Sequence, residues 1–84
     1  MPITHEFNVV QFFEDETSEY VRRNVTAKDA FDAFTHYTHS VGAQMGMVKR
    51  VIITDGLDCT NMEWQHGKGI TYPTREMLSK GVNL

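Results

Sequence analysis

Two segments that read as β-strands carry apolar side chains on both faces, and this constrains the fold more than any other feature. Residues 6–13 alternate between two apolar sets, Phe7, Val9 and Phe13 on one face and Val10 and Phe12 on the other. Residues 47–54 repeat the pattern, with Met47, Val51 and Ile53 on one face and Val48 and Ile52 on the other. A strand with one solvated face alternates apolar with polar residues instead. Both faces of these two strands therefore need a cover.

The remaining segments complete a small α+β domain. Aromatic and β-branched residues predict strands over residues 6–13 and 19–25, joined by the polar turn 14–18 into an antiparallel hairpin. Three more strands follow over 47–54, 59–66 and 70–72, separated by turn signals at Asp55-Gly56 and at residues 67–69. The predicted order is β-β-α-β-β-β in a mostly antiparallel sheet. The core spans about residues 6–73 of a single domain, 1–84, and residues 74–84 form a short helical turn or a frayed tail.

An amphipathic helix is predicted over residues 27–41, packed on one face of this sheet. Thr26 is a candidate N-cap, and Asp29 follows three residues later at the capping-box spacing. Apolar residues recur at helical spacing at Ala27, Ala30, Phe31, Phe34, Tyr37 and Val41. Gly42 is the expected left-handed stop.

One helix can cover only one face of the sheet, so the other face needs a different partner. Exposed apolar side chains there would total on the order of a few hundred Å², near the upper limit for soluble monomers. A homodimer packed sheet to sheet is the simplest closure. The C-terminal segment and a separate protein partner are the alternatives. The interface residues predicted on this basis are Val10, Phe12, Val48 and Ile52.

Composition and charge exclude several classes of protein. The chain has 84 residues, of which 40% are hydrophobic and 23% are charged, the values of an ordinary globular domain. It contains no long apolar run and no basic, apolar leader, so neither a membrane span nor a secretory signal is expected. The single cysteine, Cys59, cannot form an internal disulfide, which favours a cytoplasmic location.

Two weak patterns suggest metal or thiol chemistry. Asp32, His36 and His39 lie at i, i+4 and i+7 of the predicted helix, so a carboxylate and two imidazoles share one face and can ligate a metal ion. A solvated helix face is the simpler interpretation. Asp55, Asp58 and Cys59 follow a strand, but an adjacent carboxylate disfavours thiolate formation and Asp-Gly is a turn signal.

A third pattern suggests nucleic-acid binding. The basic residues Arg22, Arg23, Lys49 and Arg50, with Trp64 and Tyr72 as stacking platforms, would form the binding face. The net charge of −3 argues against this role, because phosphate contact requires a basic surface. The alternation of Trp64 with Met62 favours a tryptophan in the core instead.

No catalytic motif or cofactor fingerprint stands out, and no family resemblance is evident. The leading hypothesis is a small, non-enzymatic protein-interaction or regulatory domain that forms a homodimer or binds a protein partner. The first alternative is a metal- or thiol-dependent enzyme with its site at a subunit interface. The second alternative is a nucleic-acid-binding module.

Overall fold

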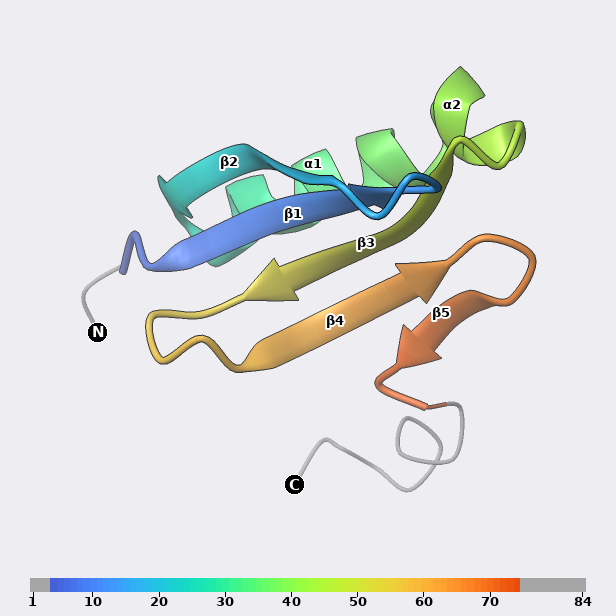
Figure 1. Ribbon diagram of the computed structural model, residues 1–84. Helices are drawn as coiled ribbons and strands as arrows, with labels where there is room; N and C mark the ends of the chain where they lie inside the picture. The colour runs from blue at the N-terminus through green and yellow to red at the C-terminus, as the bar shows by residue number, and fades with distance from the viewer. Residues whose placement is uncertain (1–3, 75–84) are drawn as a thin grey trace.

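The computed structural model describes residues 4–74, which form a five-stranded antiparallel sheet with two helices packed on one of its sides (Figure 1). The elements, in chain order, are β1 (Phe7–Phe13), β2 (Ser18–Val25), α1 (Ala27–Thr38), α2 (Val41–Gln44), β3 (Val48–Thr54), β4 (Thr60–Gln65) and β5 (Gly69–Tyr72). This confirms the predicted α+β class and element order, and each strand begins and ends within one residue of its predicted bounds. The tail predicted over residues 74–84 lies, apart from Thr74, outside the described residues.

The strand order across the sheet is β2-β1-β3-β4-β5, with every neighbouring pair antiparallel. The connection through α1 and α2 returns the chain to the far side of β1, so that β1 lies between β2 and β3. The two strands with apolar side chains on both faces, β1 and β3, are thereby placed inside the sheet. The edges are the eight-residue β2 and the four-residue β5.

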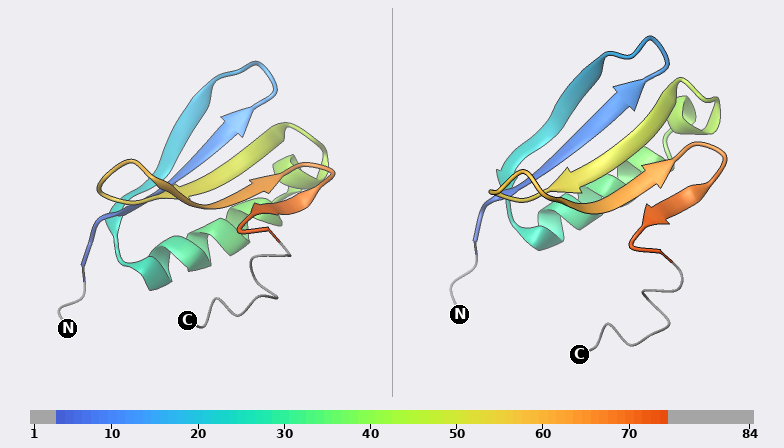
Figure 2. Two further views of the ribbon diagram at one scale, coloured as in Figure 1. Left: turned by 90° about the horizontal axis from the view of Figure 1, so that it is seen from below. Right: turned by 60° about the horizontal axis from the view of Figure 1, so that its bottom comes forward.

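The core lies between the sheet and the helices (Figure 2). Its buried residues are Val9, Ala30, Ala33, Phe34, Ala43, Val48, Val51 and Ile53. Met62 and Trp64 of β4 pack against this core, as their alternation predicts. Because Ala30 and Ala33 are small, α1 approaches the sheet closely along a narrow stripe. Phe31 lies at the edge of that stripe and is about half exposed, so the prediction that it faces the core is wrong.

The predicted helix over residues 27–41 is wrong at its C-terminal end. Thr26 caps α1 as expected, since its hydroxyl accepts a hydrogen bond from the Asp29 amide at 3.2 Å. The helix ends at Thr38, because His39 leaves the helical conformation and Ser40 caps a new turn by accepting from the Ala43 amide at 3.1 Å. Gly42 lies inside α2 rather than stopping a helix. The left-handed glycine that follows α2 is Gly46, with φ 84°.

Val48 lies on the helix side of the sheet, which corrects its prediction as an interface residue. Phe12 pairs with Arg50, but the next residue of β1, Phe13, pairs with Val48, so Lys49 is the extra residue of a β-bulge. The bulge reverses the alternation of side chains, and Val48 joins the core. Val10, Phe12 and Ile52 remain on the opposite face, as predicted.

Candidate functional site

The side of the sheet opposite the helices, here called the open face, carries no helix of residues 4–74 (Figure 1, Figure 2). Strand pairing sets one row of side chains across all five strands on this face, in the order Tyr20, Val10, Ile52, Glu63 and Tyr72. Phe12 and Arg50 oppose each other in the neighbouring row. Tyrosines therefore lie at both edges of the row, with aliphatic side chains near its centre.

Arginine side chains cover the aromatic rings of the open face. The guanidinium carbon of Arg50 lies 4.8 Å from the centroid of the Phe12 ring, and that of Arg23 lies 4.0 Å from the centroid of the Tyr20 ring. Val10 and Ile52, which lie in the same face, are only 4% and 7% exposed in the single chain. The two aliphatic side chains at the centre of the face are therefore not exposed, contrary to the exposed apolar face that the sequence predicts.

Glu63 fixes the position of the Arg50 side chain. Its carboxylate forms an ion pair with Nε of Arg50 and accepts a hydrogen bond of 2.8 Å from the Thr71 hydroxyl. Partial burial alone raises the pKa of Glu63, but the Thr71 hydrogen bond and the Arg50 charge outweigh it and hold that pKa below its ordinary value. The open face therefore carries a built ion pair beside its aliphatic centre.

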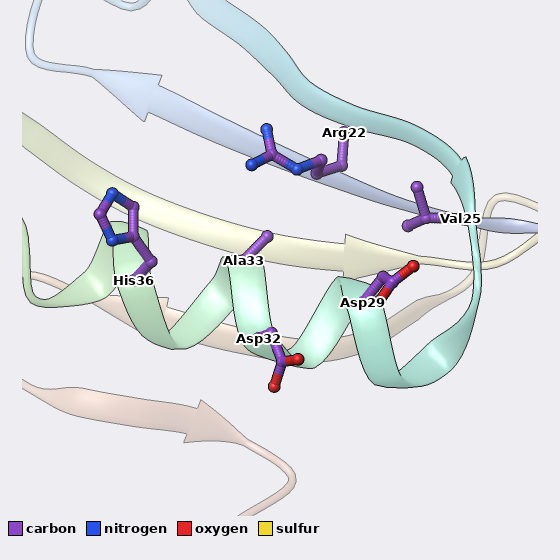
Figure 3. A pocket seen from close by; sticks show the side chains of 6 residues that line it. All are labelled: Arg22, Val25, Asp29, Asp32, Ala33 and His36. Atoms are coloured by element: carbon purple, nitrogen blue, oxygen red, sulfur yellow. The ribbon is translucent and has the colours of Figure 1, made fainter.

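A groove of about 300 Å³ lies between the edge strand β2 and α1 (Figure 3). We call it the α1/β2 groove, and its lining residues are Arg22, Val25, Asp29, Asp32, Ala33 and His36. The N-terminal end of α1 contributes Asp29, and His36 lies two turns further along, with the Arg22 side chain extending over the helix from β2 (Figure 3). The apolar lining residues are Ala33, which lies between Asp29 and His36, and Val25, which lies at the Asp29 end (Figure 3).

The charged side chains of the groove are held differently. Nη1 of Arg22 donates to the carbonyl oxygen of Val21 at 2.6 Å, and its guanidinium carbon lies 5.8 Å from the centroid of the Tyr37 ring. Asp32 forms an exposed ion pair with Lys28 at 2.9 Å, and this hydrogen bond raises the pKa of Lys28. Within residues 4–74, no ion pair joins Arg22 to either aspartate of the groove.

The three residues predicted as metal ligands are not gathered into one site. Asp32 and His36 line the α1/β2 groove. His39 lies at the C-cap of α1, where its Nδ1 is 2.8 Å from the carbonyl oxygen of Thr35. Over the described range, no group of three or more His, Cys, Asp or Glu side chains is arranged to hold a metal ion.

The loop that contains Asp55, Asp58 and Cys59 is organised as a turn. Oδ1 of Asp55 accepts hydrogen bonds from the amides of Leu57 and Cys59, and its Oδ2 accepts one from the side chain of Asn61. Asp58 has a positive φ of 61°. The Cys59 thiol is free and exposed. Because the Asp55 carboxylate satisfies the backbone of its own loop, its bonding matches the predicted turn.

The four predicted nucleic-acid contacts do not share one surface. Arg22 faces the α1/β2 groove, whereas Arg23 and Arg50 stack on rings of the open face. Lys49 is exposed at the β-bulge of β3. Arg22 is thus separated from the other arginines by the sheet, and Arg23 and Arg50 are engaged with rings of the sheet itself.

Sequence reasoning missed two features of these surfaces. Arg22, Asp29 and His36 line one groove only because α1 packs against β2. No local sequence pattern predicts that packing. The row that joins Tyr20 to Glu63 and Tyr72 depends on register across five strands. The alternation of Glu63 with Met62 and Trp64 was the one available sign that Glu63 faces away from the core.

Comparison of the chain with protein-family models, with curated proteins and with solved structures finds no match. Among the described residues, neither helix has the length and apolar character that crossing a membrane requires.

Proposed function

We propose that this chain is a small, non-enzymatic interaction or regulatory domain that self-associates through its open face. The observation that supports this most is the make-up of the face, where Phe12, Tyr20 and Tyr72 accompany Arg23 and Arg50 on a surface without a helix. Aromatic residues and arginine are the residue types enriched at protein interfaces and at their energetic hot spots.

The pattern of the face favours a second copy of the chain as the partner. A two-fold axis parallel to the strands, between Val10 of β1 and Ile52 of β3, sets β2 of one copy against β4 of the other. Arg23 of one copy then approaches the side that carries Glu63 in its partner, and the aliphatic centres face each other. This arrangement sets opposite charges, those of Arg23 and Glu63, across the proposed interface.

The size of the face predicts a weak and reversible dimer. Five strands about 4.8 Å apart and about 23 Å long give a flat footprint of roughly 450 Å² per copy. Two copies bury roughly 900 Å², below the range of about 1,200–2,000 Å² for stable interfaces. We therefore expect dissociation in the micromolar range or above.

The proposed setting is the cytoplasm. Cys59 is a free and exposed thiol, and such a thiol persists where the compartment is reducing. A reversible dimer in that setting suits a regulatory protein whose assembly responds to its concentration.

The test is the mass of the untagged chain in solution over a range of concentrations. We expect a shift from 9.6 kDa to twice that value as concentration rises, and Phe12→Glu abolishes this shift because a charge enters the centre of the face. Phe31→Glu is the matched control, since Phe31 is half exposed on α1 and away from the open face. This variant retains the wild-type dimer.

Circular dichroism verifies the fold of each variant. Tyr20→Glu, at an exposed edge position, provides a second disruption of the face if Phe12→Glu does not fold. A wild-type chain that stays monomeric at millimolar concentration contradicts the proposal. A folded variant of the open face that still forms dimers contradicts it equally.

A further inference from the structure

The α1/β2 groove separates charges of opposite sign along its length. Arg22 and His36 lie toward one end, and Asp29 lies toward the other, beside Val25 (Figure 3). Asp29 and His36 are seven residues apart on α1, which corresponds to about 10 Å along the helix axis. A ligand that satisfies both ends must therefore be dipolar and extended.

Both ends of the groove retain bonding capacity. Arg22 donates to the Val21 carbonyl through Nη1, and a guanidinium carries five N–H donors, so most of them stay available. In residues 4–74, no ion pair engages Asp29, whereas Asp32 is paired with Lys28. Asp29 is therefore the anionic end that is free to bind a cation.

The wall opposite the helix is the edge strand of the sheet. β2 has β1 as its strand neighbour, and its other side borders the groove. β2 is an eight-residue edge strand whose pairing with β1 shifts register on both sides of Arg22, and Asn24 has a φ of 52°. Its outer backbone therefore offers donors and acceptors to an incoming strand in short stretches. In an extended peptide, alternate side chains lie on one side about 6.7 Å apart. Long charged side chains at two such positions can span the distance of about 10 Å between Asp29 and His36.

A free amino acid does not fit this arrangement. Its two charges lie on substituents of one carbon atom, whereas the charges of the groove are separated by about two turns of helix. An extended peptide meets the separation and also uses the edge of β2, so the observations favour a peptide over a small zwitterion.

We propose that the α1/β2 groove binds an extended peptide segment of a partner protein, which adds a strand to β2. The peptide directs an acidic side chain toward Arg22 and His36 and a basic side chain toward Asp29. β2 runs from the cationic end to the anionic end, so an antiparallel peptide carries its basic residue two positions before its acidic one. This site lies on the helix side of the sheet and does not depend on the proposed self-association.

The probe is a blocked peptide, acetyl-TVKVEVT-amide, titrated into the ¹⁵N-labelled chain and followed by NMR. We expect shift changes at Arg22, Val25, Ala33 and His36. A peptide with glutamine in place of both charged residues binds at least tenfold more weakly, and the order-reversed peptide TVEVKVT is also weaker. Free lysine and glutamate produce no such shifts, which separates a peptide site from a small-ligand site.

Variants of the protein test the charges directly. Arg22→Gln and Asp29→Asn each weaken binding of the TVKVEVT peptide several-fold, whereas Lys68→Gln and Asp58→Asn, at exposed positions outside the groove, leave its affinity unchanged. The double variant Arg22→Glu/Asp29→Lys reverses the charges and should prefer the order-reversed peptide. The ¹⁵N NMR spectrum of each variant without peptide confirms that the fold is retained.

Three results overturn the proposal. They are equal affinity for the charged and neutral peptides, shift changes confined to the open face, and no binding of any peptide at millimolar concentration. The two proposals fail separately, because Phe12→Glu abolishes the dimer but retains peptide binding. Conversely, Arg22→Gln weakens binding of the peptide but leaves the dimer intact.

Discussion

Val9 and Val10 are neighbours on β1 that point to opposite faces of the sheet, and they are almost equally buried, at 0% and 4% exposed. Val9 is covered by α1, within a core of aliphatic side chains and Phe34. Val10 is covered by the residues around it on the open face, where Arg23 and Arg50 stack on aromatic rings. Nearly equal burial is thus reached beneath a packed helix on one side of the sheet and, on the other, on a face that carries no helix of residues 4–74.

The difference has an energetic consequence. A helix that packs against a sheet is held by many contacts, so a deletion beneath it leaves a cavity that closes only in part. Side chains at an open surface are packed on one side only, so they can settle into space left below them more readily than a helix can. The helix face should therefore respond strongly to truncation, and the open face weakly.

The largest expected effect is at Phe34, the aromatic side chain of α1 that is buried in the core. Phe34→Ala should reduce the free energy of unfolding by about 4 kcal/mol, because it removes a buried ring and leaves a cavity. Phe12→Ala, on the open face, should cost about 1 kcal/mol, since its ring is partly exposed. Urea denaturation measures both. Equal losses would mean that the open face is as tightly packed as the core.

Two neighbouring isoleucines of β3 give a sharper comparison. Ile53 on the helix face and Ile52 on the open face have the same side chain and are 6% and 7% exposed. Ile53→Ala should cost about 3 kcal/mol, and Ile52→Ala about 1.5 kcal/mol, because the cover over Ile52 can collapse. The urea concentration at the midpoint of unfolding gives both changes in the free energy of unfolding, provided that its dependence on urea has the same slope in each variant. If Ile52→Ala costs as much as Ile53→Ala, the cover over Ile52 is rigid.

Local sequence signals were sufficient to predict the five strands and the start of α1, but not the separate helix α2 or the way in which the elements pack. Alternation in residues 6–13 and 59–66 predicted the strands and the core position of Trp64. The side on which Val48 lies could not be predicted, because a bulge at Lys49 appears only when β3 pairs with β1. The break at His39 depends on whether Ser40 caps α2 or continues α1, and both are compatible with the local sequence.

The surfaces were less predictable than the fold. Val10 and Ile52 were placed on the open face correctly, but the contact of Arg50 with Phe12 beside them could be predicted only by knowing which side chains are cross-strand neighbours. The α1/β2 groove brings together Arg22 and His36, which are 14 positions apart in the chain. Such a meeting is a property of helix packing, and periodicity along either element alone does not contain it.

The smallest expected effect concerns the ion pair of the open face. Because the pKa of Glu63 in the folded chain lies below its ordinary value of 4.5, the unfolded chain binds the proton more readily. The stability that Glu63 contributes is therefore fully present above pH 4.5 and is lost as the pH falls through its folded pKa. Glu63→Gln should cost about 1 kcal/mol at pH 7 and reduce the loss of stability below pH 4.5.

Denaturation of the wild type and of this variant at a series of pH values measures the effect. Asp58→Asn, at an exposed position in the β3–β4 loop, is the control and should leave the acid profile unchanged. Parallel acid profiles for the wild type and Glu63→Gln would mean that Arg50 and Thr71 do not stabilise the charged carboxylate. The Arg50–Glu63 ion pair would then contribute no more to the free energy of unfolding than an ion pair in solvent. The open face would be held less strongly than the helix face, although Val9 and Val10 are almost equally buried.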